Sequence, residues 1–408
     1  MSWKVPYSGI SNRPGLEEAT AVLQALQQDA LSFGPLVPKL AAEFAAFTGA
    51  KHAVTVSSCT AALQLTVQLL RLQPGDEIIS TPQTFWATLW PLVARRCRIR
   101  FADIDPNSLN IDPNTIEPLI TPKTKAIYLV HHGGQAADLD PVLEIARRHG
   151  LRVVEDCAHA PGARYKGRCV GTLGDFGCFS FHSLKNMTAG EGGMLVTNDE
   201  ELLQGAPQLL SIGALGEMRE RAERTIGPYA EPKYHRDGHA RNAYRLEYVR
   251  DDFEVGTNYR MSELEAALAL VQLRRLDELN ERRRAIARRL NDGLRDVPGI
   301  VLQQEKPYAY HIYHLYTLFF QPEVVGACKD DFIRCLEQDE GIQIILRYFP
   351  VHLLPEFRAR GHRFGECPVA EKVYFEQQVE LPIYGHLTDE QIEHMIHGVR
   401  RSVQRLQR

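Results

Sequence analysis

One lysine, Lys185, stands between an apolar run and a glycine-rich turn, in the stretch F-S-F-H-S-L-K-N-M-T-A-G-E-G-G at residues 179–193. Glycines allow the backbone to approach a bound group closely. An amine held at the end of an apolar strand can lose its proton by desolvation and attack a carbonyl. The stretch therefore predicts a lysine that forms a Schiff base, the chemistry of pyridoxal phosphate (PLP) enzymes. Taken alone, the same lysine could belong to a solvated loop.

Small hydroxyl residues follow a short β-rich run at Ser58, Cys59 and Thr60, and a helical pattern begins there. The free N–H groups and the positive end of a helix dipole at such a position favour a phosphate. An ordinary helix cap gives the same pattern, so this motif is weak by itself.

A second strand-like run ends on carboxylates in E-D-C-A-H-A, residues 155–160. Asp156 could pair with a protonated pyridine nitrogen, an attraction of about 4 kcal/mol at close range and an effective dielectric near 20. Glu155 points to the opposite face of the strand and is not expected to take part. His159 follows in the same loop, where it could serve the site or only begin a turn.

Two aromatic residues, Phe85 and Trp86, open a helical pattern after another strand. Either ring could stack on a flat cofactor, although core packing would also account for each.

The elements that must position these residues alternate between strands and helices. Strands are expected at residues 53–56, 77–80, 99–101, 126–130, 151–155, 177–181 and 194–197. Helices are expected between them at 60–70, 85–94, 112–119 and 139–149, after N-terminal helices at 16–31 and 37–47. This order predicts an α/β fold with a mainly parallel sheet and ligands at the carboxyl ends of the strands.

The second half of the chain has a different pattern. A polar, charge-dense segment at 213–252 is expected to be an insertion or flap, and 262–294 to be one long helix. Strands at 300–303, 313–320 and 342–346 with helices at 330–338 and 388–406 predict a smaller α+β domain. We expect residues 1–255 to form the N-terminal arm and large domain, and 256–408 the linking helix and small domain.

Composition limits the classes of function. The 408 residues carry a formal net charge of -4, which argues against nucleic-acid and anionic-membrane partners. No apolar run approaches the length of a membrane span, and no signal sequence opens the chain, so a cytoplasmic protein is expected. The eight cysteines form no Cys-x-x-Cys pair, and neither a metal site nor redox chemistry is predicted.

Taken in order, the motifs resemble one known family. S-C-T-A-A-L, the aromatic pair after T-P-x-T, H-x-G-Q-A-A-D, E-D-C-A-H-A, the lysine stretch and G-x-N-Y-R-M-S-E-L-x-A-A all occur in this chain. Together they resemble the DegT/DnrJ/EryC1/StrS aminotransferases, PLP-dependent sugar and cyclitol enzymes of fold type I. The resemblance runs over nearly the whole chain and implies a large domain with a seven-stranded, mainly parallel sheet plus a smaller C-terminal domain.

The resemblance implies a role for each matching residue. Lys185 would be the Schiff-base lysine, Asp156 the partner of the pyridine nitrogen, and His159 a residue beside the cofactor ring. Further cofactor contacts would come from Ser58, Cys59, Thr60, Ser180, His182 and Phe85, with Trp86 as the alternate ring. Asn258 matches an asparagine that reaches the phosphate of the neighbouring subunit, which implies a homodimer with shared sites. Cys59 departs from the family's usual glycine and requires a negative φ at that turn.

The implied reaction moves an amino group from L-glutamate or L-glutamine to a keto-sugar, often nucleotide-linked, or a keto-cyclitol, with Lys185 carrying the proton. The stretch R-Y-F-P-V-H at 347–352, which includes Tyr348 and His352, resembles the acceptor-side lining. Basic residues there and in 213–252 suit a polyol ketone, with or without a phosphate, better than an apolar keto acid.

The sequence alone leaves three alternatives open. PLP-dependent sugar dehydratases have histidine at the lysine position, and Lys185 argues against them. A non-catalytic PLP-binding regulator would not need the full set of Lys185, Asp156 and Asn258. A nicotinamide oxidoreductase is the weakest, because no G-x-G-x-x-G follows a first strand.

Overall fold

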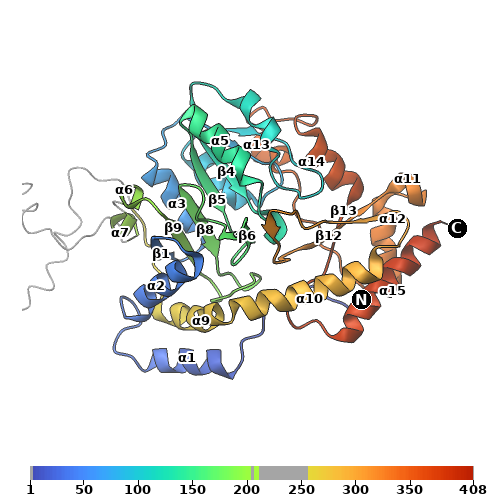
Figure 1. Cartoon of the computed structure of the whole chain (residues 1–408), viewed down its shortest axis with the longest axis horizontal. Coiled ribbons are helices and arrows are strands. Elements are labelled where there is room, and N and C mark those ends of the chain that lie inside the picture. The colour runs from blue at the N-terminus through green and yellow to red at the C-terminus, as the bar shows by residue number, and fades with distance from the viewer. Residues whose placement is uncertain (1–2, 204–205, 211–255, 408) are drawn as a thin grey trace, which may run out of the picture.

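The computed structural model describes residues 3–203, 206–210 and 256–407. A seven-stranded sheet lies between helices in the larger part of the molecule, in the order β1-β9-β8-β5-β4-β2-β3 (Figure 1). Its strands are β1 His52–Val56, β2 Glu77–Ser80, β3 Arg98–Phe101, β4 Thr124–Val130, β5 Arg152–Asp156, β8 Phe176–Ser180 and β9 Gly193–Thr197. The pairs from β3 to β8 are parallel, whereas β9 runs antiparallel to β1 and β8.

The predicted α/β fold and its strands are confirmed, each strand within two residues of its expected bounds. Strands β2, β8 and β9 are buried along their whole length, as expected where helices cover both faces of a parallel sheet. Because both faces of these strands are buried, their sequences are largely apolar and could be recognised as strands.

Helices flank this sheet and precede it. They are α1 Leu16–Leu26, α2 Leu36–Thr48, α3 Cys59–Leu69, α4 Trp90–Ala94, α5 Leu139–His149, α6 Glu200–Leu203, α7 Ala206–Leu209 and α9 Glu263–Arg274. Helix α9 packs against both N-terminal helices, and Glu263 at its start accepts hydrogen bonds from the N–H groups of Leu36 and Val37 (2.8 and 3.2 Å).

Two expected helices are wrong. The stretch 112–119 forms only the short 3₁₀ turns Pro113–Thr115 and Glu117–Leu119, because each contains a proline that cannot donate a backbone hydrogen bond. The stretch 85–94 divides into a 3₁₀ turn, Trp86–Thr88, and α4. Further 3₁₀ turns are His132–Gly134 and Val351–Leu353.

The expected single helix at 262–294 is two helices, α9 and α10 Leu276–Leu294, which meet at Arg275. The sequence has no glycine or proline there. The break follows from packing: α9 lies on the large sheet's core, whereas α10 runs along the small domain to α15 (Figure 1). The Arg275 guanidinium is 2.8 Å from Glu18 of α1, which fixes the joint to the N-terminal arm.

The smaller part contains a three-stranded sheet in the order β10-β12-β13. Its elements are β10 Ile300–Leu302, β12 Tyr316–Phe320, β13 Gln378–Leu381, α11 Pro322–Val325, α12 Lys329–Arg334, α13 Pro355–Arg358, α14 Pro368–Lys372 and α15 Asp389–Leu406, with π turns at Cys335–Asp339 and Val373–Gln377. A capping box between Thr388 and Gln391 begins α15. Both chain ends lie on this side of the molecule (Figure 1).

The expected strand at 342–346 is wrong, and β13 takes its place in the sheet. Ile342 pairs instead with Val5 of the chain's start in an isolated bridge, and Gln343 N–H donates to the Val5 carbonyl at 3.0 Å. These residues therefore pair with the N-terminal segment and not with a strand of the small sheet. A local sequence pattern does not reveal such a long-range pairing.

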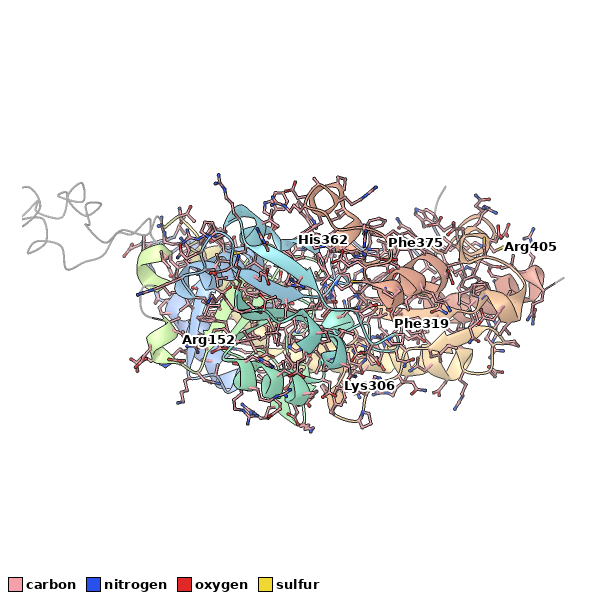
Figure 2. The ribbon with its side chains drawn as sticks, turned by 90° about the horizontal axis from the view of Figure 1, so that it is seen from above. Arg152, Lys306, Phe319, His362, Phe375 and Arg405 are labelled. Carbon is pink, nitrogen blue, oxygen red and sulfur yellow. The ribbon has the colours of Figure 1, made fainter. Side chains whose placement is uncertain are left out.

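A third small sheet of β11 Ala309–Tyr310, β6 Arg164–Tyr165 and β7 Arg168–Cys169 joins the two parts. Seen from above, the molecule is elongated, with the labelled Arg405 at the small-domain end and Arg152 toward the other end (Figure 2). Within the described ranges, no helix has the length and apolar character needed to cross a membrane. The segment predicted as a flap, 213–252, lies outside the described residues.

Candidate active site

A cavity of about 390 Å³ opens where the carboxyl ends of the central strands meet the small domain. It is lined by Ser58, Cys59, Thr60, Leu63, Thr84, Phe85, Ala87, Val130, Asp156, Ala158, His159, Ser180, His182, Leu184, Lys185, Glu191, His314, Arg347 and Tyr348. Asp156 and Ser180 are the last residues of β5 and β8, so the parallel sheet itself brings them together.

Lys185 lies in the turn after β8, half-buried, and its neighbour Asn186 anchors that turn. The Asn186 amide donates to Asn280 Oδ1 (2.9 Å) and to the Ile312 carbonyl (3.0 Å). Burial lowers the pKa of the Lys185 amine to about 8; Asp156 opposes that shift, and the guanidinium of Arg347 adds to it. A lysine with such a pKa is partly neutral near pH 7–8 and can act as a nucleophile or base.

Asp156 is buried, and hydrogen bonds hold its carboxylate in one orientation. Oδ2 accepts from the Thr88 hydroxyl at 2.6 Å, and Oδ1 accepts from the Ala158 N–H at 3.0 Å. The Cys59 thiol lies 3.8 Å from Oδ1. A fixed negative charge in this cavity would favour a cationic ring nitrogen beside it.

His159 is stacked between two rings. Its ring centroid lies 4.4 Å from that of His314 and 5.6 Å from that of Tyr348, with interplanar angles of 28° and 13°. Nδ1 accepts from the Gly133 N–H (3.3 Å), so Nε2 carries the hydrogen and donates to the Tyr348 hydroxyl (2.9 Å). Burial and the Lys185 charge hold the pKa of His159 well below its usual range, so this imidazole is neutral.

The start of α3 forms the opposite wall. Ser58 is its N-cap and accepts from the Ala61 N–H at 3.1 Å. Gly193 lies against this turn so closely that a Cβ there would be 2.7 Å from the Cys59 nitrogen. Cys59 does not adopt a positive φ. A side chain is therefore tolerated at this turn, as the replacement of the family's usual glycine required. Ser58, Cys59, Thr60 and Ser180 line the cavity, so a helix N-terminus with hydroxyl side chains beside it could hold an anion there.

Ten of the predicted site residues line the cavity: Ser58, Cys59, Thr60, Phe85, Asp156, His159, Ser180, His182, Lys185 and Tyr348. Three do not. Trp86 packs against Phe85 and Trp90 outside it. His352 is fully buried and pairs with Glu371 at 2.8 Å, because the turn after Pro350 lies against the large domain. Asn258 is exposed and does not line the cavity of its own chain.

Arg347 lines the cavity, as expected of the stretch 347–352, whereas the sequence patterns did not point to His314 of the small domain or to Thr88 behind Asp156. Arg347 lies over the Tyr7 ring at 5.5 Å, and no described carboxylate is within ion-pair distance of it. Thr88 follows Thr84 by four residues, and the two hydroxyls lie 2.7 Å apart, a spacing that could have indicated it. His314 had no comparable local signal.

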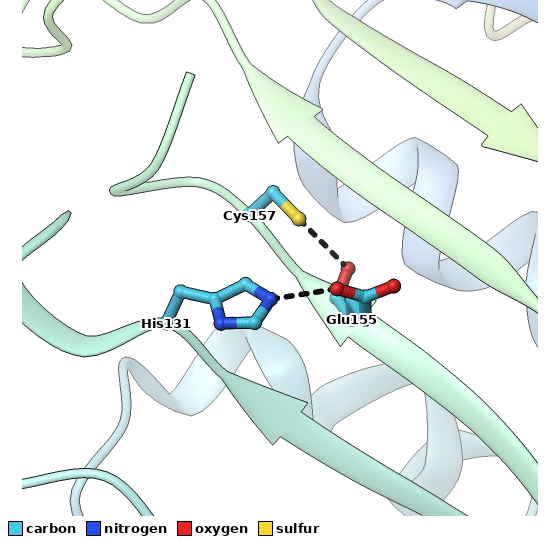
Figure 3. Close-up of side chains that lie close together, drawn as sticks. All are labelled: His131, Glu155 and Cys157. Atoms are coloured by element: carbon cyan, nitrogen blue, oxygen red, sulfur yellow. Dashed lines mark hydrogen bonds and ion pairs between the residues drawn. The ribbon is translucent and has the colours of Figure 1, made fainter. Parts of the chain in front are cut away.

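Outside the cavity, His131, Glu155 and Cys157 lie close enough to hold a metal ion (Figure 3). Their hydrogen bonds point to a structural role instead. Glu155 accepts from His131 Nε2 (2.9 Å) and from the N–H groups of Gly171, Leu173 and Gly174. Burial alone would raise the pKa of Glu155, but these bonds lower it. Each carboxylate oxygen of Glu155 therefore already accepts two hydrogen bonds and has no lone pair left for a metal.

The donor set of the cavity fits PLP. An amine, a buried carboxylate, an aromatic ring and a helix N-terminus are the groups that its aldehyde, ring nitrogen, ring face and phosphate require. The volume also falls within the roughly 300–1,000 Å³ of small-molecule sites.

Comparison with known proteins gives a consistent result. Residues 13–400 match the DegT/DnrJ/EryC1/StrS aminotransferase family. The chain is 37% identical over 387 residues to the spore coat polysaccharide biosynthesis protein SpsC of Bacillus subtilis (strain 168), covering 95% of this chain and 94% of that protein.

Solved structures agree with the sequence comparison. The aminotransferase TlmJ from Streptoalloteichus hindustanus is 30% identical, with a TM-score of 0.84 over 99% of this chain and 100% of that one. The PLP form of the putative sugar aminotransferase Spr1654 from Streptococcus pneumoniae is 25% identical, with a TM-score of 0.84 over 98% and 99% of the two chains.

Proposed function

This chain belongs to the DegT/DnrJ/EryC1/StrS aminotransferase family, and from that premise we propose that it moves an amino group from L-glutamate or L-glutamine to a keto-sugar or keto-cyclitol. Enzymes of this family are PLP-dependent, so the chain is a PLP-dependent transaminase. The observation that carries the proposal is the amine of Lys185 in the cavity that also contains the buried carboxylate of Asp156.

The central residues of the cavity each have a role in the proposed reaction. Lys185 would hold the cofactor and, once released from it, carry the proton to and from the reacting carbon. Asp156, fixed by Thr88, would keep the ring nitrogen protonated. Bound PLP supplies the electron sink for the carbon from which the proton leaves. The neutral His159 would face the ring, and its bond to Tyr348 keeps its orientation.

Glutamate and glutamine each carry an α-carboxylate, and the positively charged guanidinium of Arg347 could bind it. Its guanidinium lines the cavity without a described ion-pair partner and is near enough to Lys185 to lower the pKa of that amine. The carboxylate closest to Lys185 in a bound donor is the one on the carbon that bears the reacting amine. Arg347 therefore suits the α-carboxylate of glutamate or glutamine.

Three groups that can bind the hydroxyls of an acceptor line the cavity. His182, Glu191 and Tyr348 line the cavity along with the donor-binding Arg347. Such a lining favours a polyol ketone over an apolar oxo acid. The name of the Bacillus relative, which refers to spore coat polysaccharide, supports an acceptor made for an envelope polysaccharide.

We also propose a homodimer with shared sites. Asn258 is exposed, as is required of a residue that serves a neighbouring subunit. Close to it in the chain, Arg260 lies over Phe33 at 4.9 Å. The N-terminal arm exposes large apolar side chains, with Leu16 85% and Phe33 75% accessible. Apolar side chains gathered in one segment in this way favour a surface that a partner covers.

The function is tested by the half-reaction of the protein loaded with pyridoxamine phosphate. Its conversion to the PLP form is followed by absorbance with a nucleotide-linked keto-sugar, a phosphorylated keto-sugar and a free keto-inositol. Pyruvate and a branched-chain oxo acid serve as comparators, and 2-oxoglutarate as the donor's counterpart. At least one polyol ketone should react far faster than both comparators. Turnover with the simple oxo acids alone would refute the sugar assignment.

A further inference from the structure

A second cavity lies along the edge of the large sheet and shares no lining residue with the catalytic one. It measures about 790 Å³, twice the catalytic cavity's volume. Its lining consists of Glu77, Cys97, Arg98, Ile99, Arg100, Phe101, Leu119, Phe357, Arg360, Gly361, His362, Arg363, Gly365 and Glu366. The sheet ends at β3, and the segment after α13 forms the facing wall.

The side chains that line this cavity carry a net positive charge, whereas the whole chain is acidic. Four arginines face two glutamates in this cavity, whereas the whole chain has a formal net charge of -4. Among the described residues, Arg100 has one ion-pair partner, Glu77 at 3.6 Å, and Arg360 pairs with Glu356 one helical turn away at 2.6 Å. No described carboxylate lies within ion-pair distance of Arg98 or Arg363. These two guanidinium groups can therefore bind an anion without giving up an ion pair to a described residue.

The two walls are fixed in position by packing between them. His362 has its ring 4.9 Å from that of Phe101 of β3 and 6.1 Å from that of Phe357. Its Nδ1 is 3.0 Å from Glu366, which closes the segment on itself. Figure 2 labels His362 on the upper side of the molecule, between the large sheet and the small domain. The arginines of β3 and of the 360–366 segment thus face one cavity.

We propose that this cavity is a second, non-catalytic binding site for a small phosphorylated molecule, held chiefly by Arg98 and Arg363. A guanidinium presents paired N–H donors that match the oxygens of phosphate, and several such groups around one space favour a multivalent anion. The volume accommodates a diphosphate or a nucleotide.

The test measures binding of inorganic pyrophosphate by calorimetry to the protein loaded with PLP, so that the catalytic phosphate cradle is filled. The wild type should bind one pyrophosphate per chain. The double variant Arg98→Gln/Arg363→Gln should bind at least about tenfold more weakly, because two charge-assisted contacts are lost. The matched control, Arg288→Gln/Arg405→Gln, removes two exposed arginines elsewhere and should bind within about twofold of wild type.

A second ligand defines what kind of anion the cavity binds. Uridine diphosphate in place of pyrophosphate distinguishes a nucleotide site from a simple diphosphate site, and tighter binding of either one supports the proposal. Basal transamination should be unchanged in the Arg98/Arg363 variant. An absence of binding to the wild type, equal weakening in both double variants, or pyrophosphate inhibition competitive with the keto acceptor would each overturn the proposal.

Discussion

The reactivity of Lys185 depends on what surrounds its side chain. Burial removes water from the amine, and Arg347 repels its proton, whereas Asp156 only partly compensates. A lysine in water has a pKa of about 10.4. Lowering it to about 8 means that a useful fraction of Lys185 is neutral at physiological pH, before any cofactor is bound.

This shift can be measured on the protein without PLP. A short pulse of acetic anhydride at a series of pH values, followed by mass spectrometry, should label Lys185 with a midpoint near pH 8. The exposed Lys123 is the internal control for the labelling chemistry at each pH. PLP should protect Lys185 and leave Lys123 reactive. A Lys185 midpoint at the ordinary lysine value of about 10.4 would show that its surroundings do not perturb its amine.

Arg347 gives a prediction about donor selectivity. Arg347→Gln should raise the KM for L-glutamate about tenfold or more, because a charge-assisted bond to the α-carboxylate is lost. The wild type should accept glutamine, which keeps the α-carboxylate, and discriminate against isoglutamine, which has an α-amide. The variant should lose that discrimination. A variant that changes only the acceptor's KM would place Arg347 on the other substrate.

Residues next to a strand end could be predicted from local pattern, whereas Tyr348 was found only through the family resemblance of the stretch 347–352. Asp156, Ser180 and Lys185 lie at or just after the end of a buried strand, so pattern alone places them at one edge. His314 reaches the cavity only through the docking of the small domain, which no local pattern encodes. His352 stands four residues after Tyr348 in the same motif, yet the turn at Pro350 directs it into the core.

At the scale of elements, β13 shows how one strand serves both the core and the site. Val379 and Leu381 face the apolar core of the small domain. The alternate residues, Gln378 and Glu380, are equally buried but polar, and Gln378 donates to the Arg347 carbonyl and to Glu380. The strand thus fixes the backbone of the Arg347–Tyr348 pair. Its mixed pattern also explains why no strand was predicted there.

Glu380 should make the stability of the protein depend on pH. Burial raises its pKa from the ordinary 4.5 to about 8, so over that window the folded chain binds a proton that the unfolded chain releases. Stability from this group is therefore present below pH 4.5 and is lost as pH rises through 8, by about 1.4 kcal/mol per pH unit. Glu380→Gln keeps the shape without the charge and should remove this loss.

The comparison is made by urea unfolding of the protein without PLP at pH 5 and pH 9. Glu380→Gln should be more stable than wild type at pH 9 and nearly equal to it at pH 5. Glu376→Gln, an exposed change in the same segment, should follow wild type at both values. If all three proteins showed the same dependence on pH, Glu380 would titrate normally and its burial would not raise its pKa.

At the scale of the whole molecule, the cavity of one chain contains every predicted cofactor residue except Asn258 and the exposed Trp86. The exposed Leu16 and Phe33 give the N-terminal arm an apolar surface, and Phe33 lies near the loop of Asn258. In a symmetric dimer such a surface would be covered and Asn258 would approach the partner's cavity. Oligomer formation then becomes a condition for activity.

Mixing two inactive variants tests this arrangement. Lys185→Ala removes the nucleophile, and Asn258→Ala should weaken cofactor retention, so each protein alone should be impaired. After subunit exchange, half of the dimers combine one of each, and every such dimer holds one site with both residues intact. Activity should recover to about one quarter of wild type. Mixing Lys185→Ala with Asp156→Asn is the matched control, because Lys185 and Asp156 of one chain line the same cavity. In that mixture each heterodimer site keeps one altered residue, and no recovery is expected. A chain that stays monomeric at micromolar concentration with full activity, or dimers that exchange without recovery, would show that each site is complete within its own chain.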